Sequence, residues 1–118
     1  MAEAGLFVGW GAPVNGREKQ GLDVFNEAVQ WYGQLQQDGR IESFEVALLE
    51  PHGGDLGGFV LLRGSADQMS ALRASEDFER VTTRASLIVE NIGVVGAYIN
   101  EGLARAMGIY QGQLDELT

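Results

Sequence analysis

Apolar and polar residues alternate on both sides of a glycine-rich segment near the centre of the chain. Residues 41–50 and 59–63 are short runs rich in Val, Phe, Leu and Ile, and residues 51–58 between them contain Pro, Asp and four glycines. Two such runs separated by turn-forming residues are typical of an antiparallel β-hairpin. We therefore predict two strands joined by a long loop that carries His52, the only histidine of the sequence.

Before this hairpin, the sequence predicts one strand and one long helix. Residues 6–10 are a short apolar run, and the Gly, Pro and Asn of residues 11–16 favour a loop. Residues 21–37 have the clearest helical period, with an apolar and a polar side. The apolar side consists of Leu22, Phe25, Ala28, Val29, Tyr32 and Leu35. The charged residues 17–20 are expected to open the helix, and Asp38-Gly39 suits its C-terminal end.

After the hairpin, two serines predict the starts of two helices. Ser65 is followed three residues later by Gln68, which is the pattern of a capping box. Ser75 precedes two acidic residues, a second favourable helix start. The helices predicted from these signals are residues 66–73 and 76–91.

The remaining sequence predicts a last strand and a helical tail. The apolar run at 87–89 indicates that the end of the preceding helix is largely buried, and residues 93–99 predict the strand. Residues 101–118 have a helical stripe made of Leu103, Met107, Tyr110, Leu114 and Leu117. Gly108 and Gly112 each weaken this helix by about 1 kcal/mol relative to alanine, so we expect the tail to need a surface to pack on.

The order strand, helix, strand, strand, helix, strand is that of a ferredoxin-like β-α-β-β-α-β unit with an extra C-terminal helix. Right-handed crossovers would place both helices on one face of a four-stranded antiparallel sheet. A chain of 118 residues is one domain by length and can bury a core without disulfides. We therefore predict a single α+β domain over residues 1–118, with 101–118 as the tail.

Both faces of this sheet are expected to be substantially apolar. In the strand over residues 59–63, Val and Leu occupy one face while Phe, Leu and Arg occupy the other. Two helices can cover only one face, and monomers seldom expose an apolar face of this size. We expect a second copy of the sheet to stack on the open face and form a homodimer. Partial cover by the chain's own C-terminal helix is the alternative.

These features resemble the dimeric α/β barrel superfamily. The resemblance covers residues 6–100 and rests on the element order, the two-faced sheet and the run from Gly57 to Ser65 through Phe78. It implies small ferredoxin-like chains whose sheets pack face to face. The superfamily includes cofactor-independent monooxygenases, lactone isomerases, haem enzymes and proteins without an assigned activity, so the resemblance implies fold and dimer rather than chemistry. No pattern of haem ligands accompanies it, and we expect no cofactor.

The acidic composition narrows the possible partners. The chain has 17 Asp and Glu residues against 8 Lys and Arg residues, for a formal charge of −9. Such a charge repels phosphate groups, so neither nucleic acid nor an anionic membrane is an expected partner. The absence of cysteine removes thiolate chemistry and fits a reducing compartment. Because no export signal and no long apolar run are present, we expect a cytoplasmic protein.

The predicted topology gathers polar residues at one end of the sheet, where the first loop, the hairpin loop and the loop before the last strand emerge together. The residues gathered there are Trp10, Asn15, Arg17, Glu18, His52, Asp55, Glu90 and Asn91. Arg17 is suited to clamp a carboxylate, and His52 with Asp55 or Glu18 is a candidate acid–base pair. The candidate catalytic residues are His52 and Arg17. The candidate ligand-binding residues are Trp10, Asn15, Glu18, Asp55 and Asn91.

Each candidate also has a structural interpretation. Arg17 can form an ion pair with a neighbouring carboxylate, and a lone loop histidine is often exposed and idle. A metal site made of Glu50, His52 and Asp55 would lack a second histidine, so no metal is predicted. The glycine pairs of residues 51–58 match no phosphate-binding pattern and are expected to allow a tight, bulged hairpin.

Two functions from different classes fit this sequence. The first is a homodimeric binding or accessory protein with a cleft between sheet and helices for a small, partly apolar ligand. The alternative is a cofactor-independent monooxygenase or isomerase that uses Arg17 and His52. A cleft containing both of these residues and Trp10 would favour the enzyme. Trp31 and Tyr32 are expected to be core or interface residues, with a role in a pocket wall only secondary.

Overall fold

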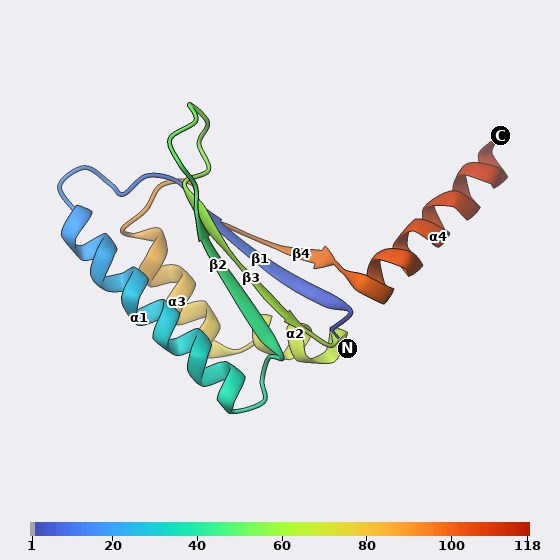
Figure 1. Ribbon diagram of the computed structural model, residues 1–118, viewed down its shortest axis with the longest axis horizontal. Helices are drawn as coiled ribbons and strands as arrows, with labels where there is room; N and C mark the ends of the chain where they lie inside the picture. Colours follow the sequence, from blue (N-terminus) through green and yellow to red (C-terminus); the bar gives the residue numbers. More distant parts are fainter. Residues whose placement is uncertain (1) are drawn as a thin grey trace.

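The computed structural model describes residues 2–118 and confirms the ferredoxin-like α+β fold (Figure 1). The antiparallel sheet has the strand order β2-β3-β1-β4. Its strands are β1 (Ala4–Trp10), β2 (Ser43–Leu48), β3 (Gly58–Gly64) and β4 (Gly93–Tyr98). The helices are α1 (Glu18–Gln37), α2 (Ala66–Arg73), α3 (Glu76–Ser86) and α4 (Asn100–Leu117). Helices α1 and α3 lie side by side over one face of the sheet.

The core lies between the sheet and these helices. Strand β1 is paired with β3 so that Leu6 lies opposite Leu62 and Val8 opposite Val60. The side chains of these four residues are buried on the helix-covered face. The helices and the start of the hairpin complete the core with Tyr32, Leu35, Ile41, Met69, Leu72 and Phe78. The alternation of the strands therefore separates a core face from a second face, as predicted.

The helix starts and ends follow from local hydrogen bonding. At the start of α2, Ser65 Oγ accepts a hydrogen bond from Gln68 N at 3.0 Å, and Gln68 Oε1 accepts one from Ser65 N at 2.8 Å, which confirms the capping box. Ser75 caps α3 by accepting from Phe78 N. After α1, Gly39 adopts a φ of +75°, the left-handed conformation that favours glycine at a helix end.

The prediction that the second helical region continues to residue 91 was wrong, because α3 ends at Ser86. The next residues pair with the loop after β1 instead: Val14 N donates to Ile88 O at 2.7 Å, and Glu90 N donates to Ala12 O at 2.9 Å. The apolar run at 87–89 is accordingly divided between a buried and an exposed environment. Ile88 is buried, whereas Leu87 is 61% exposed.

The second face of the sheet carries apolar side chains, and none of the helices within residues 2–118 lies over it. Phe7 and Phe59 stack on this face with ring centroids 5.2 Å apart. Because strand residues alternate between faces, Ala47, Leu61, Val95 and Ala97 belong to the same face. An uncovered apolar face of this kind is the feature that the sequence predicted.

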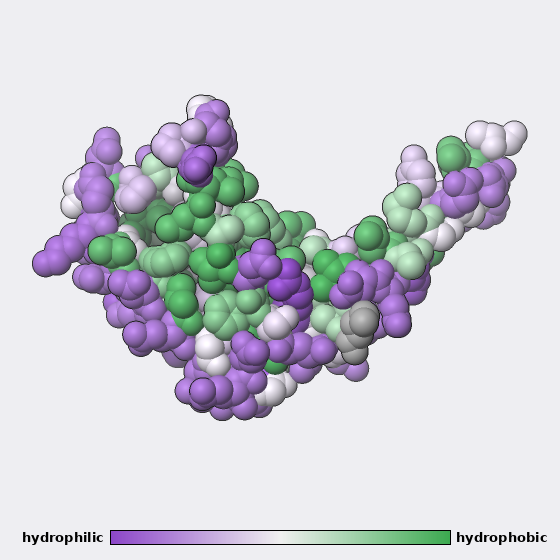
Figure 2. Space-filling model, viewed as in Figure 1, coloured by the Kyte–Doolittle hydropathy of each residue, from purple (hydrophilic) through white to green (hydrophobic). Residues whose placement is uncertain are grey.

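Helix α4 leaves the sheet on the side away from α1 and α3 (Figure 1). It touches its own subunit near its start, where Gly102 lies against the carbonyl oxygen of Glu3 and Asn100 Nδ2 donates to Ala2 O at 2.7 Å. The space-filling view shows an open gap between the rest of α4 and the body of the molecule (Figure 2). The apolar stripe predicted for residues 101–118 is therefore exposed along α4.

Candidate ligand-binding site

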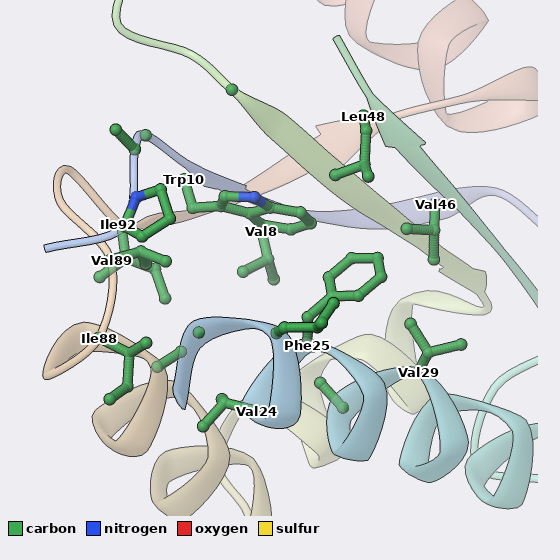
Figure 3. Close-up of a pocket in the computed structure, with 18 of the residues that line it drawn as sticks. Val8, Trp10, Val24, Phe25, Val29, Val46, Leu48, Ile88, Val89 and Ile92 are labelled. Atoms are coloured by element: carbon green, nitrogen blue, oxygen red, sulfur yellow. The ribbon is translucent and has the colours of Figure 1, made fainter. Parts of the chain in front are cut away.

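A cavity of about 510 Å³ lies between the core face of the sheet and the helices α1 and α3 (Figure 3). The sheet and the helices both contribute apolar side chains that point into it. The labelled lining residues in Figure 3 are Val8, Trp10, Val24, Phe25, Val29, Val46, Leu48, Ile88, Val89 and Ile92. The indole of Trp10 and the ring of Phe25 face each other edge to face, with centroids 6.0 Å apart. A cavity of this size and lining resembles the pockets in which proteins hold small organic molecules.

Small and exposed residues explain why the cavity is open. Gly21, Ala28 and Ala85 line it, so α1 and α3 fill little of the space that faces the sheet. Leu22 and Leu48 also line it but are largely exposed, which places them where the cavity meets solvent. Apolar side chains are visible at the surface between α1 and β2 in Figure 2. The cavity is thus preformed and accessible without unfolding an element.

Few polar groups line the cavity. Glu18 is the one charged residue among the described residues that line it, and it is exposed in the first turn of α1. The hydroxyl of Thr82 is already used, because it donates to the carbonyl oxygens of Phe78 and Glu79. Tyr32 lines the cavity as a buried ring, and its burial raises the pKa of its hydroxyl to about 12. The site therefore offers an apolar surface rather than a cluster of charges.

The three predicted loops do meet at one end of the sheet (Figure 1). Gly57 N of the hairpin loop donates to Trp10 O at 2.7 Å, and Gly11 N donates to Glu90 O at 2.7 Å. The candidate residues nevertheless separate into three groups. Trp10 and Glu18 line the large cavity; His52, Asp55, Glu90 and Asn91 line a second, more polar hollow; Asn15 and Arg17 line neither.

His52 forms hydrogen bonds within its own loop. Its Nε2 lies 2.7 Å from Leu56 O, and Gly54 N donates to its Nδ1 at 3.2 Å. In this arrangement Nδ1 accepts from the loop backbone and Nε2 faces a carbonyl oxygen, roles assigned from the hydrogen-bond partners. The histidine bonds to the backbone of the loop and not to Asp55 or Glu18, the carboxylates considered for an acid–base pair.

Arg17 joins the start of α1 to the end of α3. Its Nη1 donates to the carbonyl oxygen of Leu87 at 2.9 Å, and Leu87 closes α3. A cation at a helix C-terminus interacts favourably with the unpaired carbonyl groups there. Arg17 belongs to none of the ion pairs found within residues 2–118. The guanidinium thus has a structural contact, although not the ion pair that the sequence suggested as its alternative role.

Of the cavity residues, the sequence named Trp10 and Glu18 as ligand-binding candidates and gave Tyr32 a secondary role in a pocket wall; it placed Phe25 and Val29 only on the apolar side of a helix. Val24, Phe25, Val29 and Tyr32 all belong to the periodic region of residues 21–37, and periodicity does not distinguish a filled core from a hollow one. The small residues Gly21 and Ala28 on the same side of α1 are the signal that would have suggested a gap.

Within residues 2–118 no group of three or more His, Cys, Asp or Glu side chains is arranged to hold a metal ion. No helix in that range has the length and apolar character needed to cross a membrane.

Comparison with known proteins identifies similar folds. No family model matches the sequence, and no curated protein matches it either. A dimeric ferredoxin-like protein of unknown function from Jannaschia sp. CCS1 superposes with a TM-score of 0.63 at 13% identity, over 81% of this chain and 99% of that one. A dimeric protein of unknown function and ferredoxin-like fold from Bacteroides fragilis superposes with a TM-score of 0.61 at 12% identity, over 81% of this chain and 96% of that one. SnoaB, a cofactor-independent oxygenase from Streptomyces nogalater, superposes with a TM-score of 0.55 at 15% identity, over 84% of this chain and 95% of that one.

These similarities support the fold predicted from the sequence. The identities are too low to transfer an activity, and one fold of this type serves many functions. Of the three proteins named above, two are described without a function and one as an oxygenase.

Proposed function

We propose that this protein binds a small, largely apolar molecule in the cavity between its sheet and α1 and α3, and that it does so as a homodimer. The observation that carries the proposal is the cavity itself, about 510 Å³ and lined by apolar side chains from β1, β2, α1 and the segment after α3. Ligand pockets of proteins commonly measure about 300–1,000 Å³ and are mostly apolar. The absence of cysteine suits a reducing compartment, and we place the protein in the cytoplasm.

The affinity expected from this lining is moderate. A ligand that loses roughly 200 Å² of apolar surface to the cavity gains about 5 kcal/mol at about 25 cal/mol per Å². Before the costs of ordering are counted, this corresponds to a dissociation constant in the sub-millimolar range, on the order of 0.2 mM. Additional affinity would require a specific hydrogen bond or closer packing around the ligand.

Binding is a better match to the site than catalysis. No Arg, Lys or His lies among the described residues that line the cavity, and both ring nitrogens of His52 are engaged by its loop. General acid–base catalysis needs a titratable group within hydrogen-bond reach of the substrate, and the described lining supplies only the exposed Glu18 and the Tyr32 hydroxyl, which its raised pKa keeps protonated at neutral pH. An enzymatic function is the second candidate, because the fold of this chain is similar to that of SnoaB, a cofactor-independent oxygenase.

The binding proposal is tested by filling the cavity. N-phenyl-1-naphthylamine is a neutral probe whose fluorescence rises in apolar sites, and we expect the wild-type protein to bind it. Ala28→Trp adds a large side chain to the cavity lining and should weaken probe binding at least tenfold. Gln30→Trp adds the same side chain on the exposed side of α1 and should bind the probe as wild type does. Equal binding by Ala28→Trp, with circular dichroism unchanged, would contradict the proposal.

The homodimer is supported by the open face of the sheet and by α4. The open face presents the stacked rings of Phe7 and Phe59 together with Leu61, all of which gain by exclusion of water. Two proteins of similar fold are described as dimeric. In our proposal two sheets stack through these faces, and α4 of each subunit packs on the other subunit.

The apolar stripe of α4 supports this arrangement. Met107 is 55% exposed and Leu114 is 43% exposed, although both lie on one side of the helix. The stripe has the four–three spacing of a helix seam that packs on a partner. Helix α4 extends on the side away from α1 and α3 (Figure 1), which is the side where a stacked second sheet would lie. A second copy is therefore the occupant that we assign to the gap seen in Figure 2.

A further inference from the structure

Tyr32 is a buried polar residue in an otherwise apolar wall. Its side chain is 6% exposed, and its ring is held by Phe44 and Trp31, with centroids 5.8 and 5.5 Å away. Within residues 2–118, none of the side-chain hydrogen bonds involves its hydroxyl, whereas the nearby hydroxyl of Thr82 is bonded to backbone. The Tyr32 hydroxyl is therefore free to bond to a partner that is not part of the chain.

The unused hydroxyl is not sealed inside the protein. Among the described residues, every fully buried side-chain nitrogen or oxygen atom has a hydrogen-bond partner. The Tyr32 hydroxyl has none and must therefore keep some contact with accessible space. The cavity that this ring lines supplies such a space.

We infer that Tyr32 supplies the hydrogen bond that orients the ligand, and that the ligand is a neutral molecule with an apolar body and one oxygen function, such as a ketone, an ester carbonyl or a hydroxyl. This inference rests on the proposed binding function and specifies the chemistry of the ligand. A hydroxyl both donates and accepts, so it can serve a carbonyl or an alcohol. The rest of the lining would hold the apolar body.

The electrostatics of the cavity select against anionic ligands. A carboxylate placed beside Tyr32 would lie among apolar side chains, with no Arg, Lys or His among the described lining residues to pair with. The exposed Glu18 and the formal charge of −9 repel anions further. The pKa of Tyr32, raised to about 12 by burial, keeps its hydroxyl protonated at neutral pH and able to donate.

The test compares naphthalene, 2-acetonaphthone and 2-naphthoate, whose affinities are measured by displacement of N-phenyl-1-naphthylamine. In the wild type, we expect the ketone to bind more tightly, compared with naphthalene, than the difference in hydrophobicity between the two compounds accounts for. We expect the carboxylate to bind at least tenfold more weakly than the ketone. Tyr32→Phe should weaken ketone binding by roughly 2- to 12-fold, the range for one hydrogen bond, and leave naphthalene binding within twofold. Tyr98→Phe removes the hydroxyl of a tyrosine outside the cavity and should change neither.

The outcomes separate this inference from the binding proposal. If the probe does not bind, or if it binds Ala28→Trp as tightly as the wild type, the proposed function fails. If the probe binds in the cavity but the ketone does not displace it, the inference is overturned while the binding function stands. If naphthalene binds but the preference for the ketone is the same in Tyr32→Phe, the inference is overturned and the bond belongs to another group, such as the Trp10 indole. Tight binding of naphthoate would also overturn it.

A second measurement needs only the wild type. Isotope-edited infrared spectroscopy of 2-acetonaphthone labelled with ¹³C at its carbonyl reports whether that oxygen accepts a hydrogen bond. We expect the bound carbonyl stretch to lie at lower frequency than in hexane. A hexane-like frequency in the complex would contradict the role of Tyr32 even if the variant could not be purified.

Discussion

The ion pair between Arg40 and Asp77 connects the end of α1 to the start of α3. Arg40 Nη1 lies 2.6 Å from Asp77 Oδ2, and Nη2 donates to Oδ1 at 3.0 Å, so the contact is bidentate. The hydrogen bond from Arg40 is the main reason why the pKa of Asp77 is well below its usual range, and Ser75 adds to the effect. Both side chains are about one-third exposed, which limits the stabilisation through solvent screening.

We predict that Asp77→Asn lowers the stability at pH 7 by about 1 kcal/mol, roughly 4 °C in melting temperature. Because the pKa of Asp77 is lower in the folded than in the unfolded state, its contribution is complete above the unfolded value of about 3.9 and is lost as the pH falls below it. Denaturant unfolding of both proteins between pH 7 and pH 2 measures this: the difference should stay constant down to about pH 5 and then shrink.

The matched control for this prediction is Glu76→Gln, which removes an exposed pair with Arg80 on the same helix. Its effect should stay below about 0.5 kcal/mol at pH 7. A difference between wild type and Asp77→Asn that stays unchanged down to pH 2 would show that the carboxylate charge is not what stabilises the α1–α3 contact.

At the residue scale, the sequence could name candidates but not their partners. It correctly expected His52 in a loop and Arg17 beside the first helix. It could not show that Gly54 and Leu56 would occupy the ring of His52, because that depends on the fold of the loop, in which Gly53 has a φ of +84°. The roles of His52 and Arg17 in binding or catalysis stay predictions.

At the element scale, α4 has the apolar stripe of a packed helix, but most of this stripe is exposed. Its apolar stripe resembles the stripe of α1, yet α1 packs on the sheet while α4 extends into solvent. Although α4 has 18 residues, Gly108 and Gly112 in its interior leave it little stability by itself. Packing on a second subunit would supply the missing burial, as the dimer proposal requires.

We predict that Met107→Glu combined with Leu114→Glu weakens dimerisation at least tenfold, because two charges would be buried against the partner. The circular dichroism of the sheet and of α1 should not change, since these side chains lie beyond the contacts of α4 with its own subunit. Sedimentation equilibrium over a range of protein concentrations gives the dissociation constant.

Gln113→Glu adds one negative charge to α4 outside the stripe and serves as the control. It should dimerise like the wild type apart from a small, salt-sensitive effect. A double variant that dimerises as tightly as this control would exclude α4 from the interface.

At the scale of the whole molecule, the two faces of the sheet have different neighbours. One face is covered by α1, α2 and α3 and contains the cavity; the other carries Phe7, Phe59 and Leu61 without a covering helix in the described chain. Ligand binding and dimerisation would therefore use opposite faces of the same sheet. A variant that no longer dimerises should therefore keep the cavity, provided that its sheet stays folded.

We predict that Leu61→Asp converts the dimer to a monomer, because an unpaired carboxylate at the centre of the open face would be buried by a stacked sheet. Light scattering coupled to size-exclusion chromatography measures the mass directly. Gln30→Asp, on the exposed side of α1, is the control and should remain dimeric. An unchanged dimer mass for Leu61→Asp would contradict stacking through this face.

The sequence by itself determined the elements, their order and the two-faced sheet. Apolar periods of two and about 3.6 residues, capping serines and glycine-rich loops are local signals, and they report local conformation faithfully. They failed at residues 87–91, where hydrogen bonds to the distant loop at 11–14 end α3 early.

Only the tertiary structure decided where the space lies and which groups are free to use it. Whether an apolar stripe fills its core depends on the side chains that face it across the sheet, and here Gly21 and Ala28 leave a cavity. Whether a polar group is available depends on its neighbours: His52 is occupied by its own loop, whereas Tyr32 is left without a partner beside the cavity. Packing and hydrogen-bond competition are relations between segments distant in sequence, so no local pattern contains them.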